Sequence, residues 1–127
     1  NFDVYMQASI KPQDAKTASV VCRSNLKYLY WSFAQQLAHH ASTGCNMQAG
    51  DLLGTGTVSN SNPNGLGCLY EATRNGQQHI ELEQGGTRVY LEDGDEVEMT
   101  AWAQGPGYRI GFGTCTGLVT PADTHHQ

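Results

Sequence analysis

Apolar and polar residues alternate over much of this chain, and that pattern predicts β-strands. Residues 2–10 begin with Phe2, Val4 and Met6 at every second position, as in a half-buried strand. Residues 18–22 are rich in β-branched side chains and predict a second strand. We expect further strands at residues 68–74, 77–83, 87–91, 97–103 and 108–119, with turns at Asn75-Gly76 and Gly85-Gly86. Glycines interrupt the last of these strands, as in strands that bend at the corner of a barrel.

One stretch follows a helical period instead. Between residues 26 and 41 apolar side chains recur every three or four positions, so one face of this helix is expected to pack on the sheet. Ser24 or Asn25 can cap its start, and Thr43-Gly44 closes it. The pattern therefore predicts a mainly β fold with one principal helix.

Length, composition and charge exclude several classes of protein. The 127 residues suffice for one domain or part of one, and we expect residues 1–127 to form a single unit without an internal boundary. A net charge of −5 argues against a nucleic-acid or anionic-membrane surface, and no apolar run is long enough to span a membrane. The first residues already read as a strand and carry neither an initiator Met nor a signal sequence. We therefore expect a chain that begins within a longer protein.

Neither the cysteines nor the histidines show a metal-binding pattern. The four cysteines are widely spaced, without a CxxC motif or the His spacing of a zinc site. Three disulfide pairings would be possible in a secreted protein, but we expect a cytoplasmic protein with reduced, mostly buried thiols. His39 and His40 are adjacent on the predicted helix and so point in different directions. The acidic turn at residues 92–95 lacks the remaining spacing of an EF-hand and is interpreted as a solvated β-turn.

The stretch at residues 50–71 contains the most suggestive side chains. Gly54-Thr55-Gly56-Thr57 combines glycines, which let a ligand approach the backbone, with a Thr57 hydroxyl that can donate and accept hydrogen bonds. After a polar loop, Glu71 places a carboxylate among apolar neighbours, where it needs a partner. The residues alone also allow a plainer interpretation, a strand with one outward-facing Glu beside a glycine-rich surface loop.

Four segments form a recognisable combination. They are YLYWSFAQQLAHHASTGCNMQAGDLLGTGTVS, Leu69-Tyr70-Glu71, LEDGDEVEMTAW and GYRIGFGTCTG. Together they resemble the C-terminal part of the catalytic domain in the fumarylacetoacetate hydrolase family, in register over nearly the whole chain. The helix followed by the Gly-Asp and Thr-Gly-Thr motifs is shared by the wider superfamily, whereas the GYRIGFG ending points to its fumarylacetoacetase branch.

The resemblance implies a fold, an activity and a cofactor. It implies a mixed β-roll, a homodimer in the cytoplasm, and hydrolysis of a carbon–carbon bond of 4-fumarylacetoacetate to fumarate and acetoacetate in tyrosine and phenylalanine catabolism. In the family Mg²⁺ or Ca²⁺ is held by four carboxylates and binds the diketone, while a His oriented by a Glu activates water. No nucleic acid or membrane partner is implied.

Two residues of this chain match the family's site. Glu71 matches the catalytic Glu that orients the His, and Thr57 matches the hydroxyl that contacts a substrate carboxylate. The metal ligands, the His and the carbonyl-polarising Arg, Lys and Gln belong to sequence upstream of this chain, so no metal ligand is assigned here; Asp51 is expected to cap backbone amides instead. The 127-residue chain alone is therefore expected to be inactive.

Two alternatives stay open at this point. The chain could belong to another enzyme of the superfamily, an acylpyruvate hydrolase or a hydratase with the same metal–enolate chemistry. The glycine-rich, acidic composition would equally allow a non-catalytic β-rich binding module.

Overall fold

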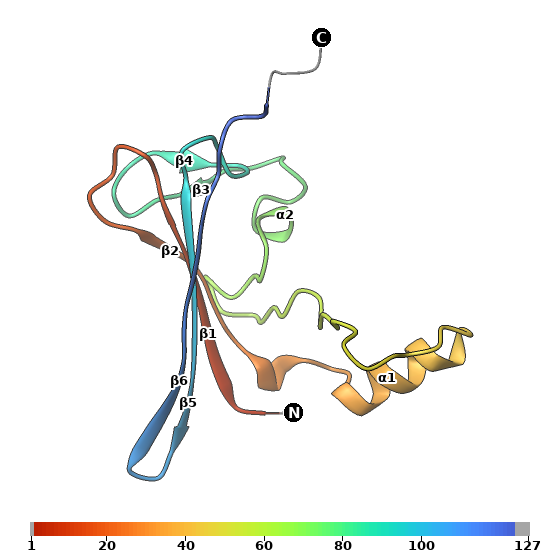
Figure 1. The fold of residues 1–127 in the computed structure, drawn as a ribbon. Helices are drawn as coiled ribbons and strands as arrows, with labels where there is room; N and C mark the ends of the chain where they lie inside the picture. The colour runs from red at the N-terminus through yellow and green to blue at the C-terminus, as the bar shows by residue number, and fades with distance from the viewer. Residues whose placement is uncertain (1, 124–127) are drawn as a thin grey trace.

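A four-stranded antiparallel sheet forms the centre of the molecule. The structure is a computed structural model that describes residues 2–123. The sheet has the order β2-β1-β5-β6 and is seen nearly edge-on in Figure 1. Its strands are β1 Val4–Lys11, β2 Ser19–Asn25, β5 Glu96–Gly105 and β6 Tyr108–Leu118. A separate two-stranded sheet pairs β3 Ile80–Glu81 with β4 Thr87–Arg88.

The alternation seen in the sequence sets the two faces of the main sheet. Ala8 lies opposite Cys22 on β2 and opposite Met99 on β5, and Met99 lies opposite Cys115 on β6. These four side chains therefore share one face, because residues directly opposite one another in a sheet point the same way. The mainly β class is confirmed, and so are strands close to the expected ranges for β1, β5 and β6.

The β5–β6 hairpin closes through Pro106-Gly107. Proline fixes the backbone angle that the second position of a type II turn requires, and Gly107 follows with φ of 78°. Such a positive φ is the conformation that glycine adopts without steric cost. A register shift between Thr100 and Trp102 then adds a bulge to the hairpin.

The helix prediction was wrong in its start and its packing. The chain continues as β2 through Asn25, which pairs with Tyr5, passes through the 3₁₀ turn η1 (Leu26–Tyr28), and only then forms α1 (Phe33–Ser42). Ser32 caps α1, exchanging hydrogen bonds with Gln35 in a capping box. Figure 1 shows α1 standing away from the sheet, and its apolar Leu37 is 45% exposed. Residues 26–32 therefore form a 3₁₀ turn and a loop in place of the first turns of the predicted helix.

A second correction concerns residues 68–74, which were expected to form a strand. They contain the short helix α2 (Leu69–Ala72), and the Thr73 hydroxyl at its end donates to the Leu69 carbonyl at 2.7 Å and accepts from the Gly76 amide. Asn75, at φ of 58°, belongs to this helix end, so the Asn75-Gly76 hairpin is also wrong. The turn at Gly85-Gly86 is confirmed, since it joins β3 to β4.

Candidate functional site

The loop that carries Thr57 is fixed to the edge strand β2. The buried Ser24 hydroxyl donates to the Val58 carbonyl at 2.7 Å, and the Asn60 side-chain amide donates to the Arg23 carbonyl at 3.1 Å. In return the Arg23 amide donates to the Asn64 carbonyl at 2.6 Å. Both sides of the loop are therefore held by Arg23 and Ser24 of one strand, which gives a defined position to the residues between them.

Ser59 connects this loop to Glu71. Its hydroxyl accepts a hydrogen bond from the Gly67 amide at 3.0 Å and donates to Oε2 of Glu71 on α2. The carboxylate side chain is exposed, and within residues 2–123 its Oε1 has no hydrogen-bond donor. Glu71 thus has one oxygen fixed and one available to a further donor.

Thr57 lies next to Gly67, the residue whose amide bonds to Ser59. A Cβ added at Gly67 would meet Thr57 Cγ2 at 2.7 Å and the Val58 carbonyl oxygen at 2.8 Å, so the backbone of Gly67 packs directly against Thr57 and Val58. Gly67 therefore contacts Thr57 directly, and its amide is linked to Glu71 by two successive hydrogen bonds through the Ser59 hydroxyl. The structure brings the two candidate residues into one cluster without a direct contact between them.

A groove of about 440 Å³ opens between this cluster and the sheet. Its walls come from the glycine-rich loop and from the face of the sheet that carries Ala8, Cys22 and Met99. Burial raises the pKa of the Cys22 thiol, and the nearby Cys68 and Glu71 add to this effect. All four cysteines are free, but only Cys22 is buried, so the prediction of mostly buried thiols was wrong. The site is thus a mostly apolar groove with Thr57 at its border, a common setting for binding a small molecule.

The acidic turn differs from its expected solvated form. Asp95 is 1% exposed, and Arg88 donates to its two oxygens from Nε at 2.9 Å and from Nη2 at 2.8 Å. The hydrogen bond from Arg88 holds the pKa of Asp95 below its usual range, although burial opposes the shift. Asp95 is therefore part of a buried ion pair, which local sequence did not predict.

The remaining candidate side chains do not assemble into a metal site. Asp51 accepts a hydrogen bond from the Gln48 amide at 2.9 Å, so its expected capping role is confirmed. Within residues 2–123 no group of three or more His, Cys, Asp and Glu side chains is placed to hold a metal ion. Residues 2–123 therefore form no metal centre by themselves.

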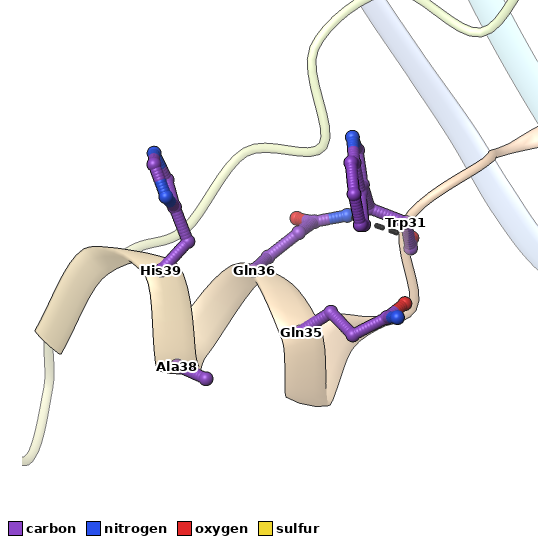
Figure 2. Close-up of a pocket in the computed structure, with 5 residues that line it drawn as sticks. All are labelled: Trp31, Gln35, Gln36, Ala38 and His39. Carbon is purple, nitrogen blue, oxygen red and sulfur yellow. Dashed lines mark hydrogen bonds between the residues drawn. The ribbon is translucent and has the colours of Figure 1, made fainter. Parts of the chain in front are cut away.

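A second hollow of about 360 Å³ lies on α1, away from this cluster. Figure 2 shows His39 on α1 and Trp31, on the segment that precedes α1, projecting to the same side. Gln36 lies between them and donates to the Trp31 carbonyl at 3.2 Å. The hollow is lined by no carboxylate and by neither candidate residue.

Over the described part of the chain, no helix has the length and apolar character needed to cross a membrane.

Sequence reasoning missed Ser59 and Gly67. Both lie in a loop where Ser, Asn and Gly recur, and nothing local distinguishes a hydroxyl that bonds Glu71 from a solvated one. Their role depends on a contact across 12 residues, which only the fold reveals.

Comparison with known proteins shows the family of the chain. Residues 10–120 match the family model described as fumarylacetoacetate (FAA) hydrolase, C-terminal. The chain is 50% identical to fumarylacetoacetase of Bos taurus over 121 residues, which cover 95% of this chain and 29% of that protein. For fumarylacetoacetase of Oryza sativa the values are 51% identity, 96% and 28%, and for that of Homo sapiens 46%, 95% and 29%. The chain thus spans less than a third of these relatives, and over that span it belongs to the fumarylacetoacetate hydrolase family.

Proposed function

We propose that this chain is the C-terminal part of a hydrolase that cleaves 4-fumarylacetoacetate to fumarate and acetoacetate. The observation that carries the proposal is the cluster in which Ser59 links Glu71 to the Thr57 loop, and this loop lines an apolar groove. Relatives named fumarylacetoacetase, matched across 95% of the chain, support this substrate. The activity belongs to the full-length protein, in the cytoplasm and as a homodimer.

Glu71 is assigned the orientation of a catalytic imidazole. Its open Oε1 would accept one ring N–H of a His from the upstream part of the protein, which fixes the tautomer and leaves the other ring nitrogen as a base. That base takes a proton from water as the water oxygen bonds to the carbonyl carbon of the fumaryl group. The carbon–carbon bond then breaks, its electron pair leaves with the acetoacetate carbon, and that carbon is protonated.

Thr57 is assigned the binding of a substrate carboxylate. Its hydroxyl can donate a hydrogen bond to a carboxylate oxygen, and the preceding Gly56 leaves the backbone accessible. Gly56 has a φ of 73°, and a Cβ there would meet no atom within 4 Å. The divalent cation that the resemblance implies, Mg²⁺ or Ca²⁺, would be held by residues outside this chain.

The test is Glu71→Gln in the full-length protein. Glutamine keeps the shape of the side chain but loses the charge that stabilises an imidazolium, so we expect kcat to fall by about 10²- to 10⁴-fold. Bound metal, measured by elemental analysis, is expected to stay unchanged, because Glu71 is not a ligand. Glu96→Gln, an exposed carboxylate on β5, is the matched control and should keep normal turnover.

Two results would contradict the proposal. Loss of metal from Glu71→Gln with normal turnover would exclude the orienting role. Faster hydrolysis of acylpyruvates than of 4-fumarylacetoacetate by the unmodified protein would instead assign it to the acylpyruvate hydrolases of the superfamily.

A further inference from the structure

Ser59 is the one side chain in the described structure that bonds directly to Glu71. A hydroxyl has a single proton to donate. The Gly67 amide, at 3.0 Å, can only donate, so it occupies an acceptor position of the Ser59 oxygen. The hydroxyl proton is then directed to Oε2 of Glu71, and the hydrogen bonds run in one direction from Gly67 through Ser59 to the carboxylate.

We propose that Ser59 is a positioning residue for Glu71, holding Oε2 so that Oε1 faces the imidazole that the carboxylate orients. The inference rests on the proposed function, and it adds a residue to that site. An exposed glutamate has three side-chain torsions and occupies many rotamers in water. A hydrogen bond to one oxygen removes most of them before the substrate arrives, and this kind of preorganisation supports catalysis.

The position of Ser59 is itself defined by the fold. Val58, the preceding residue, is 9% exposed, and its carbonyl accepts from Ser24 on β2. The following residue, Asn60, donates from its backbone amide to the Gly65 carbonyl at 2.8 Å and from its side chain to the Arg23 carbonyl. Ser59 is thus held between two anchored residues, whereas Glu71 lies on a helix of four residues. The loop therefore fixes the position of the Glu71 carboxylate, rather than the carboxylate fixing the loop.

Ser59→Ala in the full-length protein is the first variant. It removes the donor and leaves the backbone unchanged, so we expect kcat to fall by about 10- to 100-fold, as for the loss of other groups that orient a catalytic side chain. KM should stay within about twofold, because Ser59 is not assigned to the substrate, and the melting temperature should be nearly unchanged. Ser59→Thr keeps the hydroxyl and should restore most of the rate. Ser61→Ala, an exposed serine of the same loop, is the matched control.

The decisive measurement is the double variant Ser59→Ala with Glu71→Gln. If Ser59 acts through Glu71, removing both should cost no more in kcat than Glu71→Gln alone. If the two losses multiply, or if Ser59→Ala turns over at the normal rate while Glu71→Gln is impaired, the positioning role is wrong and the proposed function stands. If Glu71→Gln itself turns over normally, both are wrong.

Discussion

At the scale of single residues, Asp95 shows how a polar group in a surface turn becomes part of the core. Its two oxygens accept from Arg88, and Oδ2 also accepts from the Glu92 amide at 2.9 Å. Its backbone carbonyl accepts from the Val119 amide at 2.8 Å. One residue thus joins β4, the start of β5 and the end of β6, and a buried carboxylate is acceptable only with such partners.

We expect Asp95→Asn to destabilise the full-length protein by about 3 kcal/mol, because it removes the buried counter-charge of the largely buried Arg88 guanidinium and leaves only the exposed Glu92 carboxylate at 3.3 Å. The folded-state pKa of Asp95 is lowered, so its stabilisation is complete above the unfolded-state value of about 3.9. That stabilisation is lost as the pH falls through the lower folded-state pKa. Urea unfolding of both proteins between pH 7 and pH 3 measures this difference, which should be constant at neutral pH and shrink only below about pH 4. Asp93→Asn, in the same turn but exposed, is the control; an equal loss from it would contradict the buried-pair explanation.

At the scale of elements, long periodic strands were predictable and short elements were not. The alternation in β1 and β5 persists over eight and ten residues, enough for the two-residue period to dominate other preferences. By contrast, Leu69–Ala72 forms a four-residue helix although its sequence suits a strand, because contacts formed around it decide the outcome. The helical period was likewise wrong for residues 26–32, which form the 3₁₀ turn η1 and a loop before α1 begins at Phe33.

The candidate site was predictable to a similar extent. Thr57 and Glu71 were identified from their residue types and from the family resemblance, and they remain proposals. Ser59 was not identified, because hydrogen bonds between a loop and a helix leave no periodic pattern in the sequence. The element that matters is therefore the loop from Gly54 to Gly67, whose inner contacts position both candidates.

Gly67→Ala tests whether this loop acts as one element. The new Cβ would lie 2.7 Å from Thr57 Cγ2 and 2.8 Å from the Val58 carbonyl oxygen, closer than such atoms approach. The carbonyl cannot readily move, because Ser24 holds it. We expect Thr57 to shift and kcat/KM for 4-fumarylacetoacetate to fall by roughly 10²-fold, measured by steady-state kinetics on the full-length protein. Gly117→Ala, on β6 with no atom within 4 Å of the added Cβ, should be silent; normal kcat/KM in both variants would show that the loop tolerates the displacement.

At the scale of the whole molecule, the chain covers little of its apolar surface. It exposes 9395 Å², roughly 40% more than the ~6,600 Å² expected of a folded monomer of 13.8 kDa. Large apolar side chains are exposed on α1 and along β6, among them Phe33, Leu37, Ile110 and Phe112. β6 forms one edge of the main sheet, and an open strand edge with apolar side chains favours pairing between molecules.

We therefore expect the 127-residue chain, prepared alone, to associate rather than behave as a compact monomer. Light scattering coupled to size-exclusion chromatography should give masses well above 13.8 kDa. Thermal unfolding should lack a single sharp transition, because the four buried apolar side chains among residues 2–123 form too small a core for cooperative folding. The full-length protein, in which the remaining sequence is available to cover these surfaces, is the control and should unfold cooperatively. A monomeric 127-residue chain with one sharp transition would contradict this expectation. It would instead favour the alternative that composition alone left open, a self-sufficient β-rich binding module. A catalytic site that depends on a His from the upstream sequence does not require this chain to fold by itself.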